Sequence, residues 1–123
     1  ATPYRFSTKT KPVWKTRRLE DSELVPLTME SCTREPELFS ENGVQETFLR
    51  IKNAATQPIK VIWINYSGKR DLSPEQQNTL QPNGELDIST FVTHPFIVLD
   101  ATEQCLGIAL PAPQPGLVTI EGS

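Results

Sequence analysis

The only histidine of the chain lies in a stretch whose side chains could bind a polar ligand group. His94 is followed by Pro95 and preceded by three hydroxyls, at Ser89, Thr90 and Thr93. An imidazole donates or accepts hydrogen bonds and a hydroxyl does both, so this pattern could recognise a hydroxyl on a ligand. A second interpretation stays open, in which the His94 ring bonds to a backbone carbonyl and closes a turn that Pro95 bends.

The same residues give little support for catalysis or for metal binding. Asp87 and Asp100 flank His94, but carboxylates at such spacing are commonplace and form no nucleophilic triad with it. One histidine and two cysteines offer few ligands for a zinc site. We therefore expect no metal, no cofactor and no enzymatic activity, with a small enzyme as the weakest alternative.

The two cysteines, Cys32 and Cys105, are too far apart in the sequence for a CxxC motif. They are either two buried thiols or one disulfide that ties the N-terminal segment to the last strands. The choice depends on the redox compartment, and both an extracellular and a cytoplasmic location stay open.

The charges are divided unevenly along the N-terminal third. Residues 1–19 carry six basic side chains and no acid, whereas residues 20–46 carry eight acids and one base. The two segments could pair within the chain, or the first could be an arm for an acidic partner. Trp14 beside Lys15 could stack on nucleic-acid bases, but packing of this arm on the domain is favoured. We expect no nucleic-acid partner, because one Trp is weak support for base stacking. We expect no membrane partner, because no apolar run reaches spanning length.

The elements that would carry His94 are short strands. Alternation or β-branched runs predict strands at residues 47–53, 59–66, 86–91, 96–99, 105–110 and 117–120. Residues 69–81 are predicted to be a polar loop, and Trp63 a core residue. Eleven prolines exclude long helices, leaving short helical turns near 20–23 and 36–39. The pattern predicts an all-β, antiparallel β-sandwich at residues 46–123. We expect an irregular basic and acidic extension at residues 1–45 to pack on it. Its Tyr4, Phe6, Val13 and Trp14 belong either to an extended strand or to an arm that packs by its aromatics.

Four motifs follow one another in an order that resembles a known family. Residues 62–68 read Trp-apolar-Asn-aromatic-x-Gly around Trp63, and residues 80–84, 88–96 and an apolar strand ending in Asp100 follow. This order resembles the β domain of the von Hippel-Lindau tumour suppressor over about residues 46–110. The resemblance implies a seven- or eight-stranded sandwich of prealbumin-like type. It also implies a non-enzymatic module that binds a peptide containing hydroxyproline.

Carried over by position, the resemblance implies the binding residues Thr90, Phe91, His94 and Phe96. Thr90 replaces a serine and His94 keeps a histidine, and these two would hydrogen-bond the 4-hydroxyl. Phe96 replaces a tryptophan, which keeps an apolar wall but loses an indole donor. A further aromatic of the family falls near Gln77, and Tyr66 or Phe91 could substitute for it. The helical domain that recruits a ubiquitin-ligase partner has no counterpart, so that role is not expected.

The main hypothesis is thus a module that recognises a proline- or hydroxyproline-containing peptide or protein through a groove of His, Thr and aromatic side chains. The alternative is a structural or accessory domain excised from a larger secreted protein or enzyme. Its start at Ala1, its proline-rich end and its two cysteines suggest this alternative.

Overall fold

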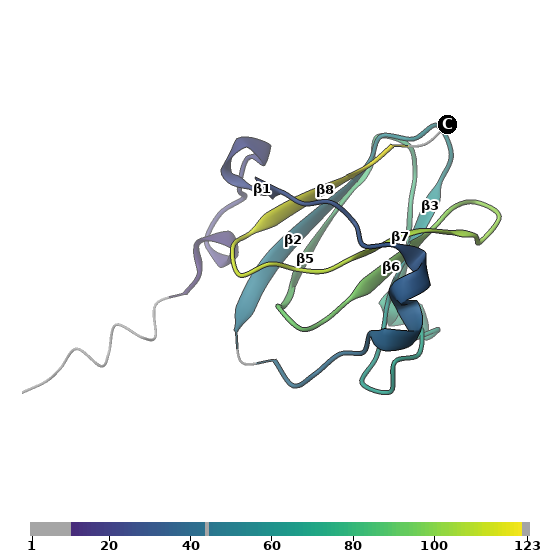
Figure 1. Ribbon diagram of the computed structural model, residues 1–123. Helices are drawn as coiled ribbons and strands as arrows, with labels where there is room; N and C mark the ends of the chain where they lie inside the picture. The colour runs from purple at the N-terminus through teal and green to yellow at the C-terminus, as the bar shows by residue number, and fades with distance from the viewer. Residues whose placement is uncertain (1–10, 44, 122–123) are drawn as a thin grey trace, which may run out of the picture.

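The computed structural model describes residues 11–43 and 45–121, and its regular structure is mostly β (Figure 1). The strands form two four-stranded sheets. The first has the order β1-β8-β2-β5, with β1 Val25–Pro26, β8 Gly116–Ile120, β2 Glu46–Asn53 and β5 Glu85–Phe91. The second has the order β4-β3-β6-β7, with β4 Gln77–Leu80, β3 Ile59–Trp63, β6 Phe96–Leu99 and β7 Cys105–Ala109. The described helices are short 3-10 turns: η2 Val13–Lys15, η3 Asp21–Glu23, η4 Cys32–Glu37 and η5 Pro74–Gln76.

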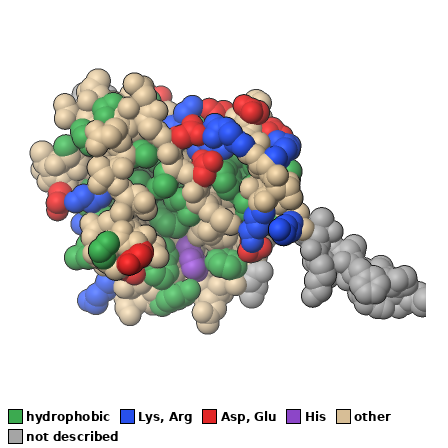
Figure 2. All heavy atoms as spheres, turned by 180° about the vertical axis from the view of Figure 1, so that it is seen from behind, with side chains coloured by type: hydrophobic (Ala, Val, Ile, Leu, Met, Phe, Trp, Pro, Cys, Tyr) green, Lys and Arg blue, Asp and Glu red, His purple; other side chains and the backbone are tan. Residues whose placement is uncertain are grey.

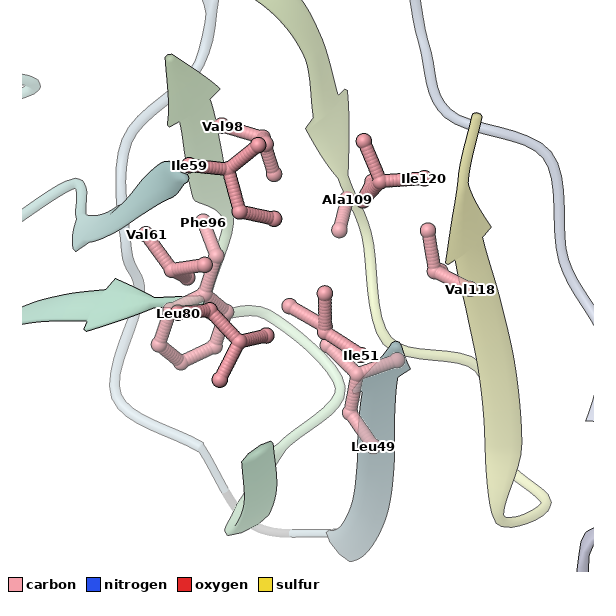
Figure 3. Packing of buried hydrophobic residues seen from close by; sticks show 10 residues of the cluster. All are labelled: Leu49, Ile51, Ile59, Val61, Leu80, Phe96, Val98, Ala109, Val118 and Ile120. Carbon is pink, nitrogen blue, oxygen red and sulfur yellow. The ribbon is translucent and has the colours of Figure 1, made fainter. Parts of the chain in front are cut away.

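The two sheets pack against each other through one apolar core, as the sequence predicts for a sandwich. Its buried residues come from both sheets and their side chains point toward one another (Figure 3). The strongest β-branched run supplies the centre of the second sheet, because such side chains fill a pleated surface well. The core residues are Leu49, Ile51, Ile59, Val61, Leu80, Phe96, Val98, Ala109, Val118 and Ile120.

The prediction of a purely antiparallel fold is wrong for the first sheet. β8 runs parallel to both β1 and β2. The reason lies in residues 110–115, where Pro111, Pro113 and Pro115 keep the chain from folding into a tight hairpin after β7. The segment instead crosses to the other sheet, and the Thr47 hydroxyl donates a hydrogen bond of 2.7 Å to the carbonyl of Ala112. Parallel neighbours need such a crossover connection.

The expected half-buried pattern of residues 47–53 is also wrong. In β2 the positions from Thr47 to Ile51 are all buried, and Arg50, which the alternation places on a solvated face, is 0% exposed. The N-terminal segment covers this outer face. Leu19, Leu24 and Phe48 form a second buried cluster there, with Trp14 packed against it. A strand covered on both faces loses its alternation of exposure.

Described bases of the N-terminal segment pair with acids of the same chain. Lys15 contacts Glu46 at 2.8 Å, Arg17 contacts Glu23 at 2.7 Å and Arg18 contacts Glu85 at 2.6 Å. Trp14 lies in η2 and not in an extended strand, and its ring centroid lies 6.3 Å from that of Phe48, as the alternative of an arm that packs by its aromatics predicts. Tyr4 and Phe6 fall outside the described residues.

Two further boundaries differ from the sequence prediction. The polar loop expected at residues 69–81 contains η5 and the edge strand β4, because Gln77–Leu80 pairs with β3. β3 ends at Trp63, and Ile64 continues only as an isolated bridge to Arg70. Cys32 at the start of η4 and Cys105 at the start of β7 are joined in a disulfide, which attaches the N-terminal segment to the second sheet.

Candidate functional site

A hollow of about 250 Å³ opens where β5, the edge strand of the first sheet, faces β3 and β6 of the second. Figure 2 shows the single histidine on this side of the molecule with hydrophobic side chains around it. Among the described residues that line the hollow, none carries a full charge. They are Trp63, Tyr66, Gln76, Ile88, Ser89, Thr90, Phe91, His94 and Phe96.

The structure brings all four residues that the sequence singled out to this hollow. Thr90 and Phe91 lie at the end of β5, His94 in the turn that follows, and Phe96 at the start of β6. Thr90 is 5% and Phe96 7% exposed. Phe96 also belongs to the core, so only part of its ring is available as a wall.

A tight turn fixes the position of His94. The backbone N–H of His94 donates to the carbonyl of Phe91 at 3.1 Å, and the N–H of Ile64 donates to the carbonyl of Pro95 at 3.0 Å. Pro95 has no N–H and a fixed φ, so it starts β6 without disturbing the ladder. The turn thereby holds the imidazole between the two sheets.

Three aromatic rings surround the imidazole. The ring centroid of His94 lies 5.3 Å from Phe91, 5.6 Å from Trp63 and 5.6 Å from Tyr66, whose ring meets it edge-on at 89°. Trp63 and Tyr66 are themselves 5.4 Å apart in an edge-to-face arrangement. These distances are those of favourable aromatic pairs, so the four rings form one packed box.

Two side-chain polar atoms in this box have no hydrogen-bond partner among the residues that the structure describes. They are Nε2 of His94 and Nε1 of Trp63, and both are buried. Buried polar atoms are nearly always bonded, so two orphans in one hollow call for an explanation. A bound ligand that supplies an acceptor to the indole and a partner to the imidazole would provide one.

The state of the His94 ring follows from its surroundings. Burial lowers the pKa of His94 below its ordinary value, and a hydrogen bond to the Glu41 backbone acts in the opposite direction. A backbone contact that raises a histidine pKa is one in which the ring donates to a carbonyl. Burial, the larger cause, favours the neutral ring, in which one nitrogen donates a hydrogen bond and the other accepts one.

The turn interpretation of His94 assigned a carbonyl partner to its ring. The hydrogen bonds that hold this turn come instead from the His94 backbone N–H and from the Thr93 hydroxyl, which donates to the Glu41 carbonyl. Nε2 of the ring has no partner among the described residues.

The sequence did not predict that Trp63 lines the hollow, and it pointed to Gln77 where the neighbouring Gln76 is the lining residue. Trp63 packs against the core as predicted, but it is only partly buried and its indole also lines the hollow. Tyr66, named as a substitute wall, lies there too, and Gln76 lines the hollow where Gln77 was expected. The three-residue spacing of Trp63 and Tyr66 gives no strand-like signal, because β3 ends between them.

The flanking carboxylates are not part of this site. Asp87 binds Arg50, and Asp100 accepts bonds within its own turn from Thr102 and Gln104. Across the described ranges, no group of three His, Cys, Asp or Glu side chains could hold a metal ion. In the same ranges, no helix is long and apolar enough to cross a membrane.

Comparison with known proteins gives one family match. The model of the VHL beta domain family matches residues 37–108, which is more than half of the chain. Among solved structures, the chain is similar to an NMR structure of a protein from Eubacterium rectale. That similarity has 21% identity and a TM-score of 0.40, and covers 68% of this chain and 84% of that chain. No curated protein matches this sequence.

Proposed function

Because this chain belongs to the VHL beta domain family, a family of protein-binding domains rather than enzymes, we propose that it binds a peptide segment and receives a proline or hydroxyproline ring in the hollow. The residues that carry this proposal are Thr90, Phe91, His94 and Phe96, together with Trp63. The match covers the hollow completely, since all lining residues fall within residues 37–108.

The size and lining of the hollow support a single rigid ring. A volume of about 250 Å³ is below the usual range for drug-sized ligands. Aromatic faces bind a prolyl ring at little entropic cost, because the ring and its backbone are already stiff. The absence of a charge among the described lining residues favours a neutral group.

The observation that carries the proposal is the pair of unpartnered atoms, Nε2 of His94 and Nε1 of Trp63, in one aromatic box. The indole can only donate, whereas a neutral imidazole carries one nitrogen that accepts and one that donates. A hydroxyl is a donor and an acceptor at once, so it can satisfy either atom. Thr90 lines the same hollow. This chemistry supports hydroxyproline over proline as the preferred ring.

The test compares a hydroxyproline peptide with its unmodified form by calorimetry. We expect the hydroxylated peptide to bind about tenfold more tightly, because a hydrogen bond at a site otherwise left unpaired contributes about 1–3 kcal/mol. His94→Ala and Thr90→Val should remove most of this difference. Thr79→Val is the matched control, because Thr79 is an exposed threonine on β4 that does not line the hollow.

The outcomes separate the parts of the proposal. Equal affinities for the two peptides would refute hydroxyproline recognition and leave proline recognition. Absence of binding for both would refute the proposal for this hollow. Loss of the difference in Thr79→Val as well would show that the variants act through general destabilisation.

The disulfide favours a second candidate function, that of an accessory domain of a larger secreted protein. Cys32 and Cys105 are joined, and such bonds persist mainly in oxidising compartments. Mass measurement of natively purified protein after treatment with a thiol-alkylating reagent tests this. Two alkylated cysteines without prior reduction would count against export.

A further inference from the structure

The loop that follows β3 carries a motif whose first and last residues take no part in the proposed binding. Asn65-Tyr66-Ser67 has the form Asn-x-Ser, with a residue other than proline in the middle. This form is the acceptor sequence for N-linked glycosylation. The chain has five asparagines, and only Asn65 stands in such a motif.

The motif lies in a surface turn. The backbone N–H of Asn65 donates to the carbonyl of Lys69 at 2.8 Å, which closes the loop at residues 65–69. Tyr66 and Ser67 are exposed, and Asn65 is half-buried. A glycan is bulky and hydrophilic, so it needs an asparagine with open space around it. The loop offers such a position.

The hydrogen bonds of the Asn65 side chain orient its amide. Oδ1 accepts from the backbone N–H groups of Ser67 at 2.9 Å and of Lys69 at 3.0 Å. Since both partners are donors, the oxygen of the amide and not its nitrogen faces them. Nδ2 donates to none of the described residues, yet it is not one of their two buried side-chain atoms without a partner. Nδ2 is therefore open to solvent.

Transfer of a glycan changes only this nitrogen. Nδ2 loses one proton and forms a bond to C1 of the first sugar. The bond from C1 to the diphosphate of a lipid-linked oligosaccharide breaks, and the lipid diphosphate leaves with the electron pair. Oδ1 is not altered, so both hydrogen bonds of the turn persist in the product. The Ser67 hydroxyl, which completes the motif, makes no hydrogen bond within the described residues.

We propose that Asn65 is an N-glycosylation site and that its glycan is attached beside the Tyr66 wall of the hollow. The bond between Cys32 and Cys105 supports this, because disulfides persist in the oxidising compartments of secretion, where lipid-linked glycans are transferred. The inference rests on the second candidate function, export, and not on peptide binding. Since Tyr66 lines the hollow, the glycan adds a large hydrophilic group at this rim.

Mass spectrometry of the natively purified protein tests the modification. Trypsin cleaves after Lys60 and Lys69, which isolates the motif in the peptide of residues 61–69. Release of the glycan by an N-glycosidase in ¹⁸O water should leave an ¹⁸O-labelled aspartate at position 65. Recovery of this peptide solely with an intact Asn65 would overturn the inference.

Two variants test whether the motif itself directs the modification. Asn65→Asp keeps an oxygen for the turn but lacks the acceptor nitrogen, and Ser67→Ala removes a hydroxyl without a described partner. Thr102→Ala is the control, because it removes a hydrogen-bonded hydroxyl from another turn. Near-UV circular dichroism verifies that each variant keeps the native fold.

All four proteins are secreted from a eukaryotic cell and compared by gel electrophoresis. Wild type and Thr102→Ala should migrate more slowly than after N-glycosidase treatment. Asn65→Asp and Ser67→Ala should migrate like treated wild type. A folded, secreted wild-type protein whose migration the enzyme does not change would overturn the inference, as would a glycan that persists in either motif variant.

The results also separate this inference from export. Cysteines that resist alkylation together with an unmodified Asn65 refute glycosylation and leave export standing. Two alkylated cysteines together with an unmodified Asn65 refute both. A labelled aspartate at position 65 supports both, whatever the peptide-binding experiment shows.

Discussion

Replacement of Arg50 tests how the N-terminal segment is held on the first sheet. The Arg50 side chain is 0% exposed and makes three hydrogen bonds to carboxylates. Two go to Asp87, at 2.7 and 3.1 Å, and one goes to Asp21 of the covering segment, at 2.9 Å. Its guanidinium carbon also lies 5.6 Å from the centre of the Phe48 ring. Arg50→Met removes the charge while keeping an unbranched apolar stem that leaves little empty space.

The expected cost can be worked from these contacts. Each hydrogen bond to a charged group contributes about 1.5–3 kcal/mol, so three together set an upper range of about 4.5–9 kcal/mol. Asp21 and Asp87 are 40% and 37% exposed, however, and water can replace part of what they lose. The charge of Arg50 also costs free energy to bury. We therefore expect Arg50→Met to lower the free energy of unfolding by about 3 kcal/mol.

Urea unfolding of the oxidised protein measures this loss. With a slope of about 1.5 kcal/mol per molar urea, the midpoint should fall by about 2 M. The matched control is Arg34→Met, because Arg34 also contacts two carboxylates, Glu30 at 2.6 Å and Glu37 at 3.4 Å, but is 41% exposed. Exposed pairs contribute about 0–1 kcal/mol, so its midpoint should fall by about 0.5 M or less.

A double-mutant cycle of Arg50→Met with Asp21→Asn isolates the contact between the sheet and the covering segment. A coupling of about 1 kcal/mol is expected for charged neighbours. The reasoning fails if Arg50→Met lowers the midpoint no more than Arg34→Met does. It also fails for the covering segment if the cycle gives a coupling within error of zero.

Three further predictions concern single features. A side-chain hydrogen bond with Arg17 lowers the pKa of Glu23 from 4.5 to about 2, so the stability from this pair is present above pH 4.5 and is lost as pH falls from there through about 2. Carboxyl NMR should show Arg17→Gln moving that pKa back toward its ordinary value, and an unmoved pKa would contradict the pairing. Replacement of both Cys32 and Cys105 by Ser should lower the free energy of unfolding by about 4 kcal/mol, because the disulfide spans a sequence separation of 73. Thermal or urea unfolding measures this loss. A loss under about 1 kcal/mol would contradict a bond that constrains the unfolded chain. Trp63→Phe should keep the wall of the hollow but lower affinity for the hydroxyproline peptide about five- to tenfold, and calorimetry showing unchanged affinity would exclude the indole as a donor.

Much of the fold and of the site could be predicted from local patterns. The β-branched run at residues 59–63 and the apolar run at 96–99 are strands, as their composition indicates. The order of the motifs around Trp63 and His94 indicated the family, which the family match confirms. Thr90, Phe91, His94 and Phe96 could be grouped because they lie within seven residues at the end of one strand and the start of the next.

Other features depended on contacts that no local pattern records. The alternation around Arg50 predicts a solvated side chain, and its burial arises only because residues 14–24 fold over β2. Local patterns did not record strand direction either, because the crossover before β8 sets its parallel pairing with β2. The Glu41 carbonyl, which accepts from the Thr93 hydroxyl beside His94, is far away in the sequence.

Local sequence patterns predicted most of the strands and grouped the residues that lie close to His94 along the chain, because periodicity and proline positions act on the backbone within a few residues. Tertiary structure alone decided what those residues face. It placed Trp63 of the second sheet and Tyr66 of the turn after β3 at the same hollow as Thr90, and it brought the Glu41 carbonyl against Thr93, next to His94. Such pairings depend on how sheets pack in space, and the same alternation of residues is compatible with many of them.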